Sequence, residues 1–159
     1  MPALAKLDKF RPLVEESGQR VDNFGPFLYC LTRKLSTGEK TNLRTRTGMK
    51  TAEAAAWMNL EHRAKAVQKL LTSKQAAQNS RLYKMLESQD PALAVFLLGF
   101  SPLQPVRERV KHYFTHLRPL VRDFDDKEVE ALGAKPGTPK FAALREAHLA
   151  GKLDKAGRK

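Results

Sequence analysis

Apolar residues recur at intervals of three and four along most of the chain, the spacing of one face of an α-helix. The first such stripe is Leu4, Leu7, Phe10 and Val14, although Pro12 is expected to break or restart the helix there. The alternation of apolar and polar residues that is typical of a half-buried strand is nearly absent. The pattern therefore predicts an all-α fold.

Helix-starting and helix-ending residues divide the first half of the chain. Pro26 fits a first helical position, and an apolar stripe follows it (Phe27, Leu28, Leu31 and Leu35). Ser36 with Glu39 fits a capping box for a short basic helix that Gly48 should end. Thr51 is expected to cap the longest helix, which runs to about residue 72. Its buried stripe is Trp57, Leu60, Ala64, Val67 and Leu71.

The second half continues in the same way. Asn79 or Ser80 is expected to cap one helix, and Asp90 followed by proline opens the next. Because 92–100 is apolar nearly all round, it is predicted to be the central buried helix. Prolines at 102 and 105 precede a helix that runs through 106–117. Together these segments predict a body of about six to seven helices over residues 1–122.

A composition shift marks the end of the chain. Five acids crowd into 123–130, where Asp125 is a predicted helix cap and the other acids suit a helix N-terminus. Gly133 should close that helix, and Thr138 with Pro139 opens a last one with Phe141, Leu144, Ala147 and Leu149 inside. Gly151 is expected to end it and to leave a frayed basic segment over 154–159. We therefore predict a small helical tail over residues 123–159.

The charge of the chain indicates the kind of partner that it binds. The 159 residues carry a formal net charge of +12, which favours polyanions and nucleic acid above all. The cations fall into three clusters, over 33–50, 107–122 and 135–159. Aromatic side chains do not alternate with them as in a platform that stacks single-stranded bases. The clusters therefore favour folded RNA held by its phosphates, with a basic protein-interaction module as the alternative.

Candidate catalytic chemistry is sparse. His112 and His116 could share one face of a helix, but no cysteine pair or nearby carboxylate completes a metal site. The single cysteine, Cys30, lies in an apolar run and is interpreted as a small core residue. No apolar segment is long enough for a signal peptide or a membrane span. We expect a cytoplasmic protein with no catalytic site, no metal and no cofactor of its own.

The tail carries a resemblance to a known family. Residues 125–154 read DDKEVEALGAKPGTPKFAALREAHLAGKLD, a short helix ending in Leu-Gly, a Pro-Gly loop, and a helix closing on Ala and Gly. This pattern resembles the C-terminal end of bacterial-type class II tRNA nucleotidyltransferases, the CCA-adding, A-adding and poly(A) polymerase family. The body resembles that family in the order of its helices, from about residue 20. The family's catalytic head, with its Gly-Ser signature and metal-binding aspartates, has no counterpart in residues 1–159.

The resemblance implies a region that holds the tRNA elbow, either within a longer enzyme that supplies a catalytic head or as a stand-alone protein. Its partner would be tRNA or another folded RNA. Which nucleotide such an enzyme adds, and the oligomeric state, stay open. The predicted RNA-binding residues are Arg44, Arg46, Arg81, Arg118, Lys135, Gly137, Thr138 and Lys140. In the tail loop, Lys135 and Lys140 flank a helix N-terminus whose free N–H groups could receive a phosphate.

Overall fold

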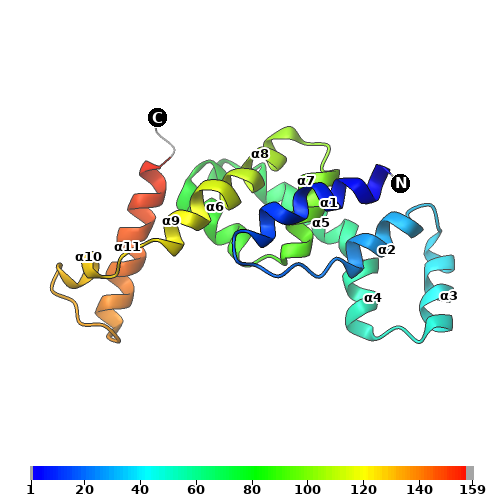
Figure 1. Cartoon of the computed structure of the whole chain (residues 1–159), viewed down its shortest axis with the longest axis horizontal. Helices are drawn as coiled ribbons and strands as arrows, with labels where there is room; N and C mark the ends of the chain where they lie inside the picture. Colours follow the sequence, from blue (N-terminus) through cyan, green and yellow to red (C-terminus); the bar gives the residue numbers. More distant parts are fainter. Residues whose placement is uncertain (1, 157–159) are drawn as a thin grey trace.

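The computed structural model describes residues 2–156, and within them every regular element is a helix, which confirms the predicted all-α fold. The molecule is elongated, with α3 at one end and the tail helices α10 and α11 at the other (Figure 1). The body comprises α1 (Pro2–Glu15), α2 (Phe24–Thr32), α3 (Thr37–Thr47), α4 (Thr51–Met58), α5 (Leu60–Leu71), a 3₁₀ turn η1 (Lys74–Ala77), α6 (Asn79–Glu87), α7 (Pro91–Phe100), α8 (Gln104–His112), a π-helical turn η2 (Tyr113–Leu117) and α9 (Arg118–Arg122).

Helix α7 lies at the centre of the body, as its sequence predicts. The Asp90 carboxylate accepts a hydrogen bond from the Ala92 amide (2.9 Å), and Pro91 occupies the first turn. All seven residues from Ala92 to Leu98 are buried, against α1, α2, α5 and α8. A helix that is apolar all round needs such a surrounding, since it has no face to present to water.

Tertiary packing explains two differences from the predicted helix breaks, one at Pro12 and one at Asn59. Pro12 lies inside α1, which continues to Glu15 because Leu7 and Val14, on either side of the proline, are buried in the core. The long helix predicted from Thr51 divides at Asn59 into α4 and α5. The break lets α4 pack on α2 while α5 packs on α7. The body therefore has more and shorter helices than predicted.

The start of α4 also differs from the prediction. Lys50, not Thr51, is its N-cap residue, and the amide of Lys50 donates to the Glu53 carboxylate (3.1 Å). In α6, Asn79 is the first helical residue rather than a cap, and Ser80 follows it.

Helix α2 buries the opposite face from the one predicted. It begins at Phe24, so Pro26 is its third residue rather than its first. A β-carbon on Gly25 would lie 2.6 Å from the backbone oxygen of Ala56, so the backbones of α2 and α4 touch there. Pro26 and Cys30 are buried on this side. Phe27 and Leu31, expected inside, are each 47% exposed on the other.

The tail holds a small core of its own. Helices α10 (Lys127–Glu130) and α11 (Pro139–Lys155) bury Val129, Ala134 and Phe141 between them, and Leu144 packs against this core. Asp126, and not Asp125 as predicted, is the N-cap residue of α10, although the Asp125 carboxylate accepts a hydrogen bond from the Lys127 amide (2.9 Å). Ala147, predicted to lie inside, is exposed.

Helix α11 does not end at Gly151 but continues to Lys155. It continues because Leu153 is buried against the body and because the Asp154 carboxylate accepts from the Ser80 amide (2.8 Å). The predicted frayed segment is therefore ordered helix up to Lys155. Its remaining cations, Arg158 and Lys159, lie outside the described residues.

Candidate nucleic-acid interface

Helix α3 has 11 residues and none of them is buried, a property that it shares only with the five-residue α9 among the helices of residues 2–156. Local hydrogen bonds hold it instead. The Ser36 amide donates to the Glu39 carboxylate (2.7 Å), the Glu39 amide donates to the Ser36 hydroxyl (3.3 Å), and Gly48 ends the helix at φ 61°, a conformation that favours glycine. The predicted capping box and stop are confirmed. Most of the surface of α3 is therefore free to contact a partner.

The charge around α3 is strongly positive. The segment 31–50 contains one acid, Glu39, and its carboxylate is engaged by the N-cap, whose hydrogen bonds from Ser36 lower the pKa of Glu39. The basic residues of the segment are Arg33, Lys34, Lys40, Arg44, Arg46 and Lys50. None of them is in an ion pair with another described residue. Their field is thus available to a polyanion.

The two predicted arginines of α3 point to different sides of the helix. Lys40 and Arg44 are four residues apart and share a face, whereas Arg46 lies two residues further on, roughly 200° around the axis. Both arginines are exposed and lie in the last turn, where positive charge suits the helix dipole. Lys40 and Arg44 therefore present their charges on one side of α3, and Arg46 presents its charge on another.

Arg118 is not a free surface cation. It is half-buried, and its guanidinium donates to the backbone oxygen of Ser17 (3.2 Å) and, at 3.4 Å, to the hydroxyl of Tyr113. It ties the end of α1 to the π-helical turn, so we leave it out of the phosphate-contacting surface. Arg81, in contrast, is exposed on α6.

The tail loop adopts the turn that its glycines and prolines predict. Gly137 has φ 81°, and Thr138 caps α11, with its hydroxyl accepting from the Phe141 amide (3.2 Å) and donating to the Lys135 carbonyl (2.7 Å). Lys135 and Lys140 are exposed. The free N–H groups expected here are fewer than predicted, because Thr138 engages the Phe141 amide and Pro139 has none. The lysines, rather than the helix N-terminus, are the main cationic feature of this loop.

The structure does not bring the predicted residues together into one site. Arg44 and Arg46 lie on α3 at one end of the molecule, and the loop before α11 lies at the other (Figure 1). The candidate interface is therefore extended, with two basic ends joined by the helical body.

The third basic cluster is partly neutralised within the tail. Asp126 pairs with Arg145 (2.6 Å), and Glu128 contacts both His148 (2.9 Å) and Lys152. The hydrogen bond from Lys152, and then that from His148, lowers the pKa of Glu128. The acids of 123–130 thus do more than favour a helix N-terminus, because they also hold α10 against α11.

The described residues contain no group of three or more His, Cys, Asp or Glu side chains placed so that they could hold a metal ion. His112 and His116 do stack, with ring centroids 5.0 Å apart, as their spacing predicts. Burial, followed by the neighbouring His116, lowers the pKa of His112. Cys30 is buried, and burial raises the pKa of its thiol, which suits a packing residue rather than a nucleophile.

No family model, curated protein or solved structure matches this chain. Within residues 2–156, no helix combines the length and apolar character that crossing a membrane requires.

One surface feature of α2, next to α3, was not predicted from the sequence. Phe24, Phe27 and Leu31, at spacings of three and four, form an exposed apolar stripe on α2. The signal was present in the sequence: Gly25, Pro26 and Cys30 are small residues on the other side of the helix, where they allow close contact with α4. Apolar character alone favoured the wrong face.

Proposed function

We propose that this chain binds folded RNA, of the tRNA type, through its phosphate backbone, with α3 as the principal contact. The observation that carries the proposal is a helix with no buried residue inside a segment of six cations and one acid, whose carboxylate is engaged by the helix cap. A helix kept out of the core by its composition, yet capped at both ends, presents an ordered set of charges. Ordered charges on a rigid element suit the regular phosphates of a folded RNA.

The resemblance of residues 125–154 to the end of class II tRNA nucleotidyltransferases supports the same class of partner. In that reading the chain corresponds to the body and tail of such an enzyme, which hold the tRNA, and nucleotide addition belongs to a head domain. The exposed loop with Lys135 and Lys140 would contact phosphates at the far end of the molecule. Incubation of this chain with nucleoside triphosphates and magnesium should then leave a tRNA lacking its 3′ end unextended.

The proposal is tested by the salt dependence of tRNA affinity. Contacts to about six phosphates should weaken binding about a thousandfold between 50 and 200 mM salt, because each contact releases counterions. The double variant Lys40→Gln with Arg44→Gln should bind more weakly, and the slope of log affinity against log salt should become shallower by about two.

The matched control is Lys69→Gln with Lys74→Gln, which removes the same charge from exposed positions on α5 and η1. It should leave the slope close to that of the unmodified chain. Equal loss in both double variants would show that net charge, and not α3, governs binding. A chain that ignores tRNA altogether would overturn the proposed function.

A second candidate function, protein–protein interaction, is favoured by the exposed stripe on α2. Phe27 and Leu31 are each 47% exposed, and Phe24 extends the same face. An apolar stripe with helical spacing can lie against a helix of a partner protein. The variant Phe27→Ser with Leu31→Ser separates the two functions. Unchanged tRNA affinity in that variant would show that the stripe is not part of the RNA-binding surface. A fall of tenfold or more would show that the stripe contacts RNA.

A further inference from the structure

We propose that the cavity between the end of α1 and the η2–α9 segment binds a small organic anion, a ring carrying one phosphate or carboxylate group, through the guanidinium of Arg118. This site is independent of the proposed RNA surface on α3. It lies in the body, and its arginine is half-buried rather than part of an exposed basic surface.

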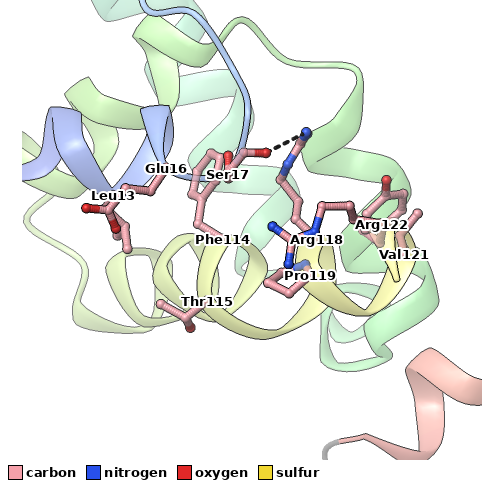
Figure 2. A pocket seen from close by; sticks show the side chains of 10 residues that line it. Leu13, Glu16, Ser17, Phe114, Thr115, Arg118, Pro119, Val121 and Arg122 are labelled. Atoms are coloured by element: carbon pink, nitrogen blue, oxygen red, sulfur yellow. Dashed lines mark hydrogen bonds between the residues drawn. The ribbon is translucent and has the colours of Figure 1, made fainter. Parts of the chain in front are cut away.

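The cavity is bounded by three parts of the chain that are distant in sequence: the end of α1, Tyr83 of α6, and the segment from η2 to α9 (Figure 2). It has a volume of about 380 Å³, within the range of small-molecule sites and more than one inorganic anion needs. Leu13 comes from α1, Phe114 from the π-helical turn and Pro119 from α9, and these side chains form the apolar part of a lining that also contains polar groups. A ring can be covered by such walls, whereas a bare phosphate gains nothing from them.

Arg118 lines this cavity, and its guanidinium lacks both an acidic partner and a full set of hydrogen-bond acceptors among the described residues. Its two terminal nitrogens donate to the Ser17 carbonyl and, at 3.4 Å, to the Tyr113 hydroxyl, which are both neutral acceptors. Its Nε is buried and has no partner among the described residues. No carboxylate within residues 2–156 lies at ion-pair distance from the guanidinium. Half-buried charges are normally paired, so the cavity lacks the counter-charge that a ligand oxyanion would supply.

The other two charged side chains that line the cavity, Arg122 and Glu16, are exposed and opposite in sign, so the half-buried charge of the lining is that of Arg118. Arg122 lines the cavity but pairs with Asp123 (2.9 Å). Glu16 also lines the cavity and is exposed, and within the described residues it is in no ion pair. Burial, followed by the charge of the nearby Glu87, raises the pKa of Tyr83 to about 12, so its phenol adds no negative charge.

The π-helical turn is the second structural sign of a binding site here. Residues 113–117 widen the helix just before Arg118, and Tyr113, Phe114 and Leu117 are all buried. Single π-turns inside α-helices occur frequently at functional sites, since they change the direction of the next side chains at a cost in backbone hydrogen bonding. The residue that follows this turn is the arginine on the cavity wall.

Calorimetric titration with four probes tests the ligand class. Phenyl phosphate and benzoate carry a ring and an oxyanion, inorganic phosphate lacks the ring, and benzyl alcohol lacks the charge. We expect at least one of the first two to bind at least tenfold more tightly than both of the others, and comparison of the two distinguishes phosphate from carboxylate. Binding of inorganic phosphate as tightly as phenyl phosphate, or no binding of either ring anion, overturns the proposal.

Two variants assign the site. Arg118→Gln should lower the affinity for the ring anion tenfold or more, whereas the exposed Arg20→Gln, with the same change of charge, should not.

A second variant, Leu13→Phe, leaves Arg118 in place, because Arg118 also holds the Ser17 carbonyl and its own substitution can lower stability. The larger side chain fills the cavity without removing any group from Arg118, so it should abolish binding in a folded protein. Full affinity in a folded Leu13→Phe variant would place the ligand elsewhere. The Lys40 and Arg44 double variant should bind the ring anion normally, which keeps this test separate from that of the RNA surface.

Discussion

Trp57 is the largest fully buried side chain, and its indole shows how one residue joins two helices. The indole N–H donates to the Thr32 hydroxyl (2.8 Å), which itself donates to the Leu28 carbonyl (2.6 Å). The chain of hydrogen bonds runs from α4 to α2 beside the point where Gly25 touches α4. Burial of a polar tryptophan edge is tolerated because this acceptor exists.

Thr32→Val should destabilise the protein by about 1–3 kcal/mol, because it keeps the shape of the side chain but leaves the indole N–H buried without an acceptor. Urea unfolding followed by circular dichroism measures the change. In a Trp57→Phe background the same substitution should cost clearly less, since there is no N–H left to satisfy. Equal costs in the two backgrounds would show that the hydrogen bond contributes nothing.

At the residue scale, the sequence predicts whether a side chain is buried better than it predicts the side chain's hydrogen-bond partner. The burial of Trp57 follows from its place in an apolar stripe. Its acceptor is 25 residues away in sequence, and no local pattern indicates it. The surroundings of Arg118 are likewise not indicated by its sequence neighbours. Those neighbours are basic and predict an exposed cation, whereas Arg118 is half-buried and lines a cavity.

At the scale of elements, the tail is fastened to the body by a helix cap supplied from elsewhere in the chain. The Asp154 carboxylate at the end of α11 accepts from the Ser80 amide (2.8 Å), the Ser80 hydroxyl (3.0 Å) and the Gln78 side chain (2.8 Å) at the start of α6. Asn79 returns a hydrogen bond to the Leu153 carbonyl (3.0 Å). A carboxylate at a helix N-terminus is stabilised both by free amides and by the helix dipole.

Asp154→Ala should therefore lower the free energy of unfolding by about 1–2 kcal/mol, the usual cost of losing an N-cap. Hydrogen exchange should also speed up at the Ser80 amide, which loses its acceptor. The control is Asp8→Ala, which removes an exposed carboxylate from α1. Unchanged exchange at Ser80 in the Asp154 variant would contradict the assignment of this cap.

Acid should weaken the contact between α10 and α11. Hydrogen bonds from Lys152, and then from His148, lower the pKa of Glu128 below its ordinary 4.5, so the folded protein binds fewer protons at this site than the unfolded chain does. The stabilisation is therefore complete above pH 4.5 and is lost as the pH falls through the lower, folded-state pKa. Glu128→Gln should be less stable at pH 7 and should lose less stability than the unmodified chain between pH 5 and 3. Parallel pH profiles in urea unfolding would contradict this.

Helix boundaries were predictable where local hydrogen bonds set them and not where packing did. The capping box of Ser36 with Glu39 and the stop at Gly48 follow from nearby residues alone. Pro12 and Gly151 are local helix breakers, yet both lie inside helices that continue to the buried residues Val14 and Leu153. Local propensity is overridden there by long-range contacts.

At the scale of the whole molecule, the basic clusters over 33–50 and 135–159 differ in how much of their charge is paired within the described residues. The cations of α3 are unpaired among the described residues, whereas Arg145 and Lys152 of the tail are neutralised by Asp126 and Glu128. No sequence pattern shows this difference, because the pairing depends on how α10 folds back on α11. Lys135 and Lys140 remain as the exposed cations of the tail loop.

Because the two basic ends lie at opposite ends of the molecule (Figure 1), we expect the affinity for RNA to depend on the size of the RNA. Lys135→Glu with Lys140→Glu should leave folding intact, since both side chains are exposed, and should make the salt slope for tRNA shallower. If one tRNA contacts both ends, the free-energy effects of this pair and of the Lys40 and Arg44 pair should add in the combined variant, because the sites share no contacts. A short hairpin that reaches only one end should respond to one pair alone, and its affinity should be lower, because it lacks the second, intramolecular contact. A tRNA salt slope that the folded tail variant leaves unchanged would confine the RNA surface to the α3 end.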